Sequence, residues 1–372
     1  IASFDAEDVK IKALANTSLQ GDFSLSGLPN FKNTFMDFNI KQLLTGQRDL
    51  EELVGKGKLP DNIKLLGGLN YKGNLTGFSK DFVSDGNLRT NLGTLTTDIN
   101  LKLNDQLNNG SYSGLLQSES FELGEFLDIP DLGTIAVNAK LEGKGFKTSD
   151  VDLGIDGKLD RIEFKNYAYT VTRVEGSLTP NFFTGLAIIK DNNVDLEFDG
   201  EVDFTGEEPK LNFNAEVRHA NLKALNIDSS DHFAAKMSLD MVGFDIDNFN
   251  GSARIDSLEY KRVNQPLQKV NFINLNAYSK NKTRNIILES DLINAEVRGD
   301  FILKELVHTG EKMLHDLLPL YFEKEKDTIA KQEFIFRIDF LQPEIITSLF
   351  APDVIISKGW IKGEFKSESD KL

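Results

Sequence analysis

The chain has 372 residues, a formal net charge of −16, a single tryptophan and no cysteine. The missing cysteines exclude a disulfide framework. The acidic balance argues against a nucleic-acid-binding protein, because no basic stripe is present to displace phosphate counterions. No apolar run is long enough to cross a bilayer. Because the sequence begins at Ile1 rather than Met, we expect an internal piece or a processed product of a longer protein.

The N-terminal segment alternates between apolar and polar residues, most clearly over residues 19–27. A period of two places successive side chains on opposite faces of a strand. Residues 40–54 change to a spacing typical of a helix. We expect a short amphipathic helix there, interrupted near Gly46, with Asp49 as a second N-cap.

Strand patterns return at residue 66 and dominate the chain up to residue 303. At 194–217, two runs of alternating apolar and polar, mostly acidic residues flank a Gly-Glu-Glu-Pro turn. This pattern predicts a long antiparallel hairpin with one apolar face and one acidic face. Glycines such as Gly73, Gly200 and Gly299 stand among apolar neighbours inside predicted strands, which indicates a sheet that bends.

Residues 305–326 change again to helical spacing, with an apolar stripe that includes Met313. We expect this amphipathic helix to cover a sheet edge; a plug in a groove or a partner-docking helix are the alternatives. A strong strand pattern follows at 334–340, and strand-like segments around Gly359 and Gly363 close the chain.

Together these patterns predict an all-β fold of about 16 to 20 strands. A sandwich or barrel is the default for such strands, but no break in composition separates units of ordinary domain size. We therefore expect one continuous repetitive segment over residues 1–372. It would be a long curved antiparallel sheet folded into an elongated U-shaped groove (a β-taco), with helical insertions at 40–54 and 305–326.

The apolar faces of the predicted strands would line this groove. An apolar surface of that extent exceeds what a soluble monomer normally exposes, so it requires an apolar ligand, and an acyl chain is the obvious candidate. The side chains that we predict to line the groove and bind lipid are Leu101, Val137, Leu153, Ile155, Val194, Leu196, Phe198, Val202, Phe204, Leu211, Phe213, Val217, Met237, Leu239, Ile286, Leu288, Val297, Phe301, Phe334, Phe336 and Ile338.

The sequence carries no catalytic signature. Residues 245–251 (DIDNFNG) do not fit a calcium loop, because Ile246 stands where the first acidic ligand belongs. Residues 110–114 (GSYSG) have Tyr112 where a nucleophile elbow needs serine. The four histidines are scattered and no cysteine or acidic ligand set accompanies them. We therefore expect no enzyme activity, no metal site and no cofactor.

Several segments resemble the AsmA/TamB group of envelope proteins, in the form found in the Bacteroidetes: 57–104, 121–147, 196–227, 290–306 and 340–365. The resemblance implies a periplasmic protein that is anchored in the inner membrane by a helix missing from this chain. It implies a repeating β-groove that carries phospholipid toward the outer membrane and supports outer-membrane biogenesis. TamB, the inner-membrane component of the translocation and assembly module, is also linked to assembly of outer-membrane barrel proteins through an outer-membrane partner, TamA.

Three hypotheses for the function follow. The first is a segment of a TamB-like conduit for phospholipid acyl chains. The second is a periplasmic chaperone or scaffold, whose groove or edge strands would hold unfolded barrel strands by β-addition. The third is a repetitive surface or adhesin stalk, in which the apolar faces would be sealed as a solid core.

Overall fold

The computed structural model describes residues 2–55, 57, 59–104, 109–146, 149–243, 247, 249–280, 283–302, 304, 332–350 and 355–366. Its twenty described strands belong to one antiparallel sheet that is not closed into a barrel, which confirms the predicted all-β fold class. The chain divides into two compact units, Ile1–Asp199 with Leu222–Asp228, and Gly200–Asn221 with Ser229–Leu372. Each unit is described by itself.

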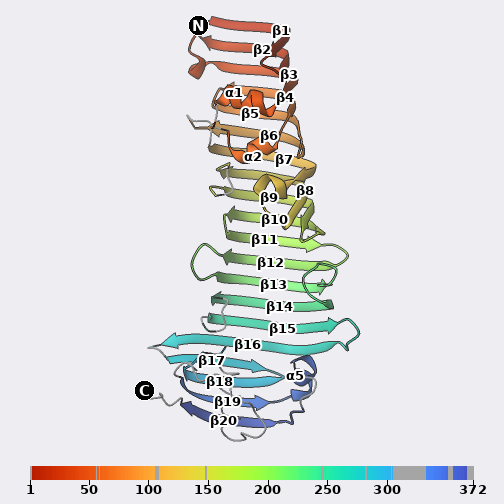
Figure 1. The fold of residues 1–372 in the computed structure, drawn as a ribbon, viewed down its shortest axis with the longest axis vertical. Coiled ribbons are helices and arrows are strands. Elements are labelled where there is room, and N and C mark those ends of the chain that lie inside the picture. Colours follow the sequence, from red (N-terminus) through yellow and green to blue (C-terminus); the bar gives the residue numbers. More distant parts are fainter. Residues whose placement is uncertain are drawn as a thin grey trace. The chain divides into compact units, whose positions relative to one another are not determined.

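In the first unit, strands β1 to β11 pair in chain order, each antiparallel to the next (Figure 1). Their bounds are β1 (Ala2–Ala13), β2 (Thr17–Leu28), β3 (Phe35–Thr45), β4 (Leu69–Phe78), β5 (Asp81–Thr90), β6 (Gly93–Leu103), β7 (Gly110–Glu122), β8 (Leu132–Lys144), β9 (Asp152–Phe164), β10 (Tyr167–Thr179) and β11 (Phe182–Lys190). The next strand, β12 (Val194–Asp203), contains the boundary between the units.

In the second unit, strands β13 to β20 also pair antiparallel in chain order. Their bounds are β13 (Lys210–Ala220), β14 (Ser230–Val242), β15 (Asn250–Arg262), β16 (Gln268–Lys280), β17 (Thr283–Ser290), β18 (Ile293–Asp300), β19 (Glu333–Phe340) and β20 (Gly359–Lys366). Sequential pairing through hairpins keeps every strand next to its neighbour in the chain, so a pattern that repeats along the sequence repeats across the sheet.

The described helices are all short: η1 (Phe31–Asn33), α1 (Gln47–Val54), α2 (Asp61–Leu65), α3 (Leu123–Leu127) and α5 (Pro343–Phe350). The sequence predicted about two helical insertions, whereas the described residues hold four α-helices. It did not predict α2, α3 or α5, because runs of five to eight residues carry too few turns for a helical period to stand out. The predicted helix at 305–326 lies outside the described residues.

The predicted helix at 40–54 is wrong over its first part, because residues 40–45 belong to β3. They pair with both neighbouring strands, and the register shifts between Ile40 and Leu43 on the β4 side. This bulge separates two inward-facing apolar residues by three positions instead of two, which gives the segment a helical spacing. The helix itself begins after Gly46, its N-cap, and Asp49 lies in its first turn rather than at a cap.

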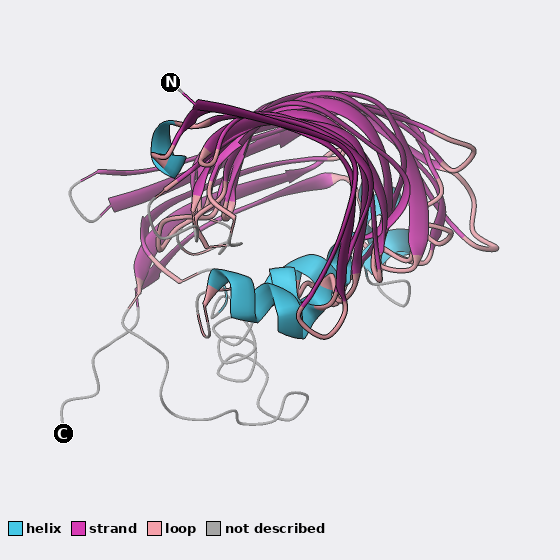
Figure 2. Ribbon diagram, turned by 90° about the horizontal axis from the view of Figure 1, so that it is seen from above, coloured by secondary structure: helices cyan, strands magenta, loops and turns pink. Residues whose placement is uncertain are grey.

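Glycine permits the bending of strand β4. Gly73 has a φ of 154°, and a Cβ there would lie 2.3 Å from the carbonyl oxygen of Asp85 on β5. The Tyr71 hydroxyl would lie 2.9 Å from the same Cβ and 2.8 Å from one built on Gly86, the residue opposite Gly73. Only glycine fits both positions. Figure 2 shows that the strands are bent rather than flat.

Candidate functional site: the apolar face of each unit

The register brings apolar residues of the first unit into rows that cross the strands. Residues directly opposite each other in an antiparallel pair lie on the same face of the sheet. Row A runs from β1 to β11 and consists of Phe4, Leu25, Met36, Gly77, Phe82, Leu101, Tyr112, Gly143, Leu153, Leu178 and Phe183. Every member is apolar, aromatic or glycine, so row A is an uninterrupted apolar line.

Two further rows lie beside row A on the same face. Row B consists of Ala6, Phe23, Phe38, Leu75, Ser84, Ile99, Gly114, Leu141, Ile155, Gly176 and Gly185. Row C consists of Val9, Gly21, Ile40, Gly73, Gly86, Thr97, Leu116, Ala139, Gly157, Val174 and Ala187. Row C is built mostly of small residues, which lets backbones and larger side chains approach it closely.

Burial differs between the rows. In row C, Ala139 is 1% exposed and joins a buried cluster with Val137, Leu159, Val171 and Val174. In row A, Phe4 is 52% exposed and Leu178 is 41% exposed. The apolar face of the first unit is therefore closed at row C and open toward row A.

The second unit repeats this arrangement. Row D consists of Leu211, Met241, Gly251, Ala277, Ile286, Val297, Phe336 and Gly363. Row E consists of Phe213, Leu239, Ala253, Leu275, Leu288, Ala295, Ile338 and Ile361. Leu211, Ala277 and Ile286 in row D are buried, whereas Ile361 in row E is 53% exposed.

The opposite face of each unit is mostly polar. Between rows A and B the alternate positions read Asp5, Ser24, Asp37, Thr76, Val83, Asn100, Ser113 and Glu142 across β1 to β8. Ion pairs between an arginine and the acid two residues along the same strand recur on this face, as in Arg254 with Asp256 at 2.7 Å and Arg337 with Asp339 at 2.8 Å. The sheet thus separates an apolar surface from a charged one.

Most of the predicted groove-lining residues share these apolar rows. Leu101 and Leu153 lie in row A and Ile155 in row B, while the ring of Phe198 on β12 is tilted against that of Phe183 in row A, with centroids 5.9 Å apart. In the second unit, rows D and E contain Leu211, Ile286, Val297, Phe336, Phe213, Leu239, Leu288 and Ile338. Their placement on one face agrees with the pattern; lipid binding by them stays a prediction.

The remaining predicted residues lie at the margins of the rows. Phe204 lies beyond the end of β12 and is 45% exposed, so it is not part of a strand face. Phe301 follows β18 and is buried against Phe334, with ring centroids 5.8 Å apart. The other predicted groove-lining residues are buried or half-buried: Val137, Val194, Leu196, Val202, Val217 and Met237.

The predicted set missed several residues that carry the apolar face. Phe82, Leu178 and Phe183 in row A and Phe38 in row B belong to it. Alternation is a signal within one strand, whereas only the register between strands shows which residues of different strands face the same side.

Hydroxyl groups on the apolar face hydrogen-bond with one another. Tyr71 is buried, and its hydroxyl donates to the carbonyl oxygen of Asn74 at 2.9 Å. The hydroxyl of Ser84 donates in turn to the Tyr71 oxygen at 3.1 Å. Burial raises the pKa of Tyr71 and of Tyr112 above the ordinary value. Both phenols are therefore neutral at physiological pH, and the face carries no charge at these positions.

Helices α2 and α3 cover one end of the apolar face in the first unit. Leu66, Leu92 and Phe121 form a buried cluster, to which Ile63 of α2 and Phe126 of α3 add their side chains. The rings of Phe121 and Phe126 meet edge to face, with centroids 5.7 Å apart. This packing covers the ends of β5 to β7 that lie away from row A.

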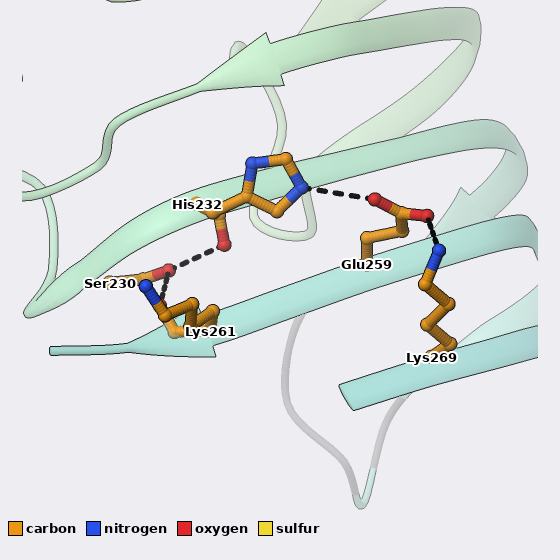
Figure 3. Close-up of polar contacts among 5 residues, drawn as sticks. All are labelled: Ser230, His232, Glu259, Lys261 and Lys269. Atoms are coloured by element: carbon orange, nitrogen blue, oxygen red, sulfur yellow. Dashed lines mark hydrogen bonds and ion pairs between the residues drawn. The ribbon is translucent and has the colours of Figure 1, made fainter. Parts of the chain in front are cut away.

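A polar cluster on the opposite face of the second unit joins strands β14, β15 and β16 (Figure 3). Nε2 of His232 lies 3.1 Å from one carboxylate oxygen of Glu259, and Nζ of Lys269 donates to the other at 2.6 Å. The hydrogen bond from Lys269 and then that from His232 lower the pKa of Glu259. Ser230 is fully buried, with its hydroxyl 2.8 and 2.7 Å from the carbonyl oxygens of His232 and Lys261. The cluster ties strands together.

Within the described part of the chain, no group of three or more metal-binding side chains comes together. In the same residues, no helix has both the length and the apolar character that a bilayer span requires.

Comparisons of the chain with protein-family models, with curated proteins and with solved structures found no match.

Proposed function

We propose that the apolar face of each unit binds acyl chains, and that the protein is a segment of a periplasmic conduit for phospholipid between the inner and outer membranes. The observation that supports this most strongly is the alignment of apolar residues in rows A to E, half-exposed at one side and buried at the other. Rows of this length expose more contiguous apolar surface than a soluble monomer usually tolerates.

The mechanism would be passive. Transfer of an acyl chain from water to any apolar surface is favourable by about 0.8 kcal/mol per buried CH₂. Because adjacent strands are about 4.8 Å apart, successive side chains in a row offer nearly equivalent contacts, and a chain can move along them without a deep trap. A charged headgroup would remain in water beyond the exposed residues of row A, because moving a charge onto an apolar face removes it from water at a large cost in free energy.

The double substitution Leu196→Asp with Phe198→Asp tests the proposal. Both side chains belong to β12 within the first unit, and Phe198 contacts Phe183 of row A. Two carboxylates on the apolar face make acyl binding unfavourable by several kcal/mol. We expect at least a tenfold loss of lipid bound per protein in native mass spectrometry and of fluorescent phospholipid transfer between vesicles, with unchanged strand content by circular dichroism.

The control is Asp195→Asn with Glu197→Gln, which alters the same strand on its other face. This variant should bind and transfer lipid like the unaltered protein. Transfer at the original rate by the Leu196→Asp, Phe198→Asp protein would refute the conduit. Absence of lipid from organic extracts of the unaltered protein, relative to a control protein, would count against it as well.

A second candidate function is a chaperone or scaffold for outer-membrane β-barrel proteins. The observation that favours it is strand β20, which pairs with β19 alone among the described strands and is exposed along most of its length. An exposed edge of this kind can accept an additional strand. Photocrosslinkers at Phe198 and Phe213 separate the two candidates, because lipid adducts support the conduit and polypeptide adducts support the chaperone.

Partners follow from the same proposal. We propose that an inner-membrane anchor would attach the conduit to the inner membrane, and that a TamA-like barrel would receive it at the outer membrane. The adhesin-stalk alternative finds less support, because a sealed core would bury the side chains of row A, and Phe4 and Leu178 are about half exposed.

A further inference from the structure

A hollow opens on the polar face of the first unit, over strands β5 to β9. Its volume is about 920 Å³, within the range of about 300–1,000 Å³ that is typical of ligand sites. Its lining includes one uncharged polar residue from each of four neighbouring strands, paired in a single row: Asn87, Thr96, Gln117 and Asn138. Each of them adjoins a member of row C in its own strand, so this polar row lies on the face opposite rows A to C. We propose that the hollow binds a neutral oligosaccharide.

A bulge in β7 lies beside the polar row. Residues 118–120 of β7 stand opposite only two residues of β6, and residues 119–120 stand opposite a single residue of β8. An extra residue of this kind bends the strand, interrupts the ladder of hydrogen bonds and turns side chains in new directions. All three residues 118–120 line the hollow. The hollow therefore coincides with a local departure from the regular sheet.

Hydrogen bonds hold the amides of the polar row in place. The Thr96 hydroxyl donates to Oδ1 of Asn87 at 2.8 Å, and Nε2 of Gln117 donates to Oδ1 of Asn138 at 3.2 Å. Within the described part of the chain, Nδ2 of Asn87, Nδ2 of Asn138 and Oε1 of Gln117 keep their capacity for a further partner. These donors and this acceptor are spread over three strand spacings, about 14 Å. A row of this length suits a short chain of sugar rings, whose hydroxyls both donate and accept.

The charges in the hollow favour a neutral sugar over an acidic one. Three carboxylates line it, those of Glu119, Glu122 and Asp160, against the single guanidinium of Arg89. A ligand that carries carboxylate or phosphate groups would meet a surface of its own sign. A neutral sugar avoids this repulsion, and its hydroxyls can donate to the carboxylates and accept from the guanidinium.

A polypeptide fits the hollow less well. Strands β5 to β9 each pair on both sides, so their backbones offer no edge to an added strand. Among the described residues that line the hollow, only Leu92 and Val137 have apolar side chains, and both are buried. An apolar side chain of a peptide would find little to contact there, whereas hydroxyl groups find partners throughout.

Saturation-transfer NMR at neutral pH tests the inference with two neutral tetrasaccharides, cellotetraose and chitotetraose, and with the acidic tetragalacturonate. The described lining contains no aromatic ring on which a sugar could stack. Binding then depends on hydrogen bonds alone, each of small net value, so we expect a Kd of about 1 mM for at least one neutral sugar. Tetragalacturonate should bind at least about threefold more weakly, because of the three carboxylates.

Asn87→Ala and Gln117→Ala should each weaken binding of the neutral sugar at least about threefold, and together at least about tenfold. The matched control is Asn100→Ala, which removes an amide from the same face of β6, outside the hollow, where it donates to Asp81 at 3.3 Å. This control should bind sugar like the unaltered protein. Asn87 is exposed, so its variant decides the matter if Gln117→Ala loses strand content by circular dichroism.

The inference is overturned if neither neutral sugar binds at about 10 mM, or if tetragalacturonate binds as tightly as they do. It is equally overturned if Asn87→Ala binds sugar like Asn100→Ala. All of these variants should keep the lipid binding of the unaltered protein, since they alter the face opposite rows A to C. Sugar binding and the proposed conduit therefore succeed or fail separately.

Discussion

At the scale of single residues, Asp49 connects helix α1 with the turn between β1 and β2. Its side chain is 2% exposed, and one carboxylate oxygen accepts hydrogen bonds from the backbone N–H of Asn16 and from the Thr17 hydroxyl, both at 2.7 Å. The Thr17 hydroxyl also lies 2.9 Å from that of Thr45 at the end of β3. One carboxylate thus fixes three separate segments of the chain.

These hydrogen bonds predict a pH dependence. Led by that from Thr17, they lower the pKa of Asp49. A carboxylate whose pKa is lower in the folded state than its unfolded value of about 3.9 adds stability above that pH. The contribution is lost as the pH falls through the folded-state pKa. We expect Asp49→Asn to lower the urea midpoint at pH 7, and the difference from the unaltered protein to shrink at pH 3. An equal difference at both values would contradict this role.

The sequence located Asp49 but not its partners. Its position near the start of an apolar-periodic stretch suggested a cap, which is a local signal. The contacts with Asn16 and Thr17 span 33 and 32 residues, and no local pattern reports a contact at that separation. In contrast, alternation alone placed Leu153 and Ile155 on one face of a strand. That was possible because a period of two is a local pattern.

At the scale of elements, pairing between strands decides what a segment becomes. Residues 40–45 have a helical spacing of apolar residues, but β2 and β4 offer hydrogen bonds on both sides, and the segment forms β3. The spacing reflects the bulge after Ile40. A single sequence does not reveal a bulge of this kind, because it is a property of two strands together.

The docking of α2 and α3 depends on one aromatic residue. Phe121 is 6% exposed and contacts Phe126 of α3 within the cluster that includes Leu66 and Leu92. Replacing a buried phenylalanine by alanine typically costs about 3–5 kcal/mol. We expect Phe121→Ala to lower the free energy of unfolding by that amount and to increase hydrogen exchange in α2 and α3.

Phe78→Ala is the comparison. Phe78 also makes an edge-to-face contact, with Phe35 at 5.6 Å, but it is 43% exposed. Replacing Phe78 by alanine should lower the free energy of unfolding by about 1 kcal/mol and leave hydrogen exchange in α2 and α3 unchanged. Similar effects of both substitutions would show that the helices do not depend on the buried cluster.

At the scale of the whole molecule, the fold class could be predicted because the same signal recurs in strand after strand. Most strands alternate, several neighbouring strands are joined by tight turns, and glycine stands where strands bend, as at Gly73. Agreement between many weak local signals is what makes a fold recognisable from sequence. The boundary between the two units lies within β12, and no feature of the sequence marks it, because Asp199 and Gly200 continue the alternation without a break.

Charge and apolar surface together predict how the whole molecule responds to acid. The chain carries a net charge of −16 at pH 7 and has an isoelectric point near 4.8. Mutual repulsion keeps molecules apart at neutral pH and vanishes near the isoelectric point, where exposed apolar rows are free to associate. We expect light scattering to rise to a maximum near pH 4.8. A non-denaturing detergent that covers the apolar face should suppress most of that rise, because it masks the surface without changing the net charge. An equal rise with and without detergent would mean that the association is not driven by the apolar face.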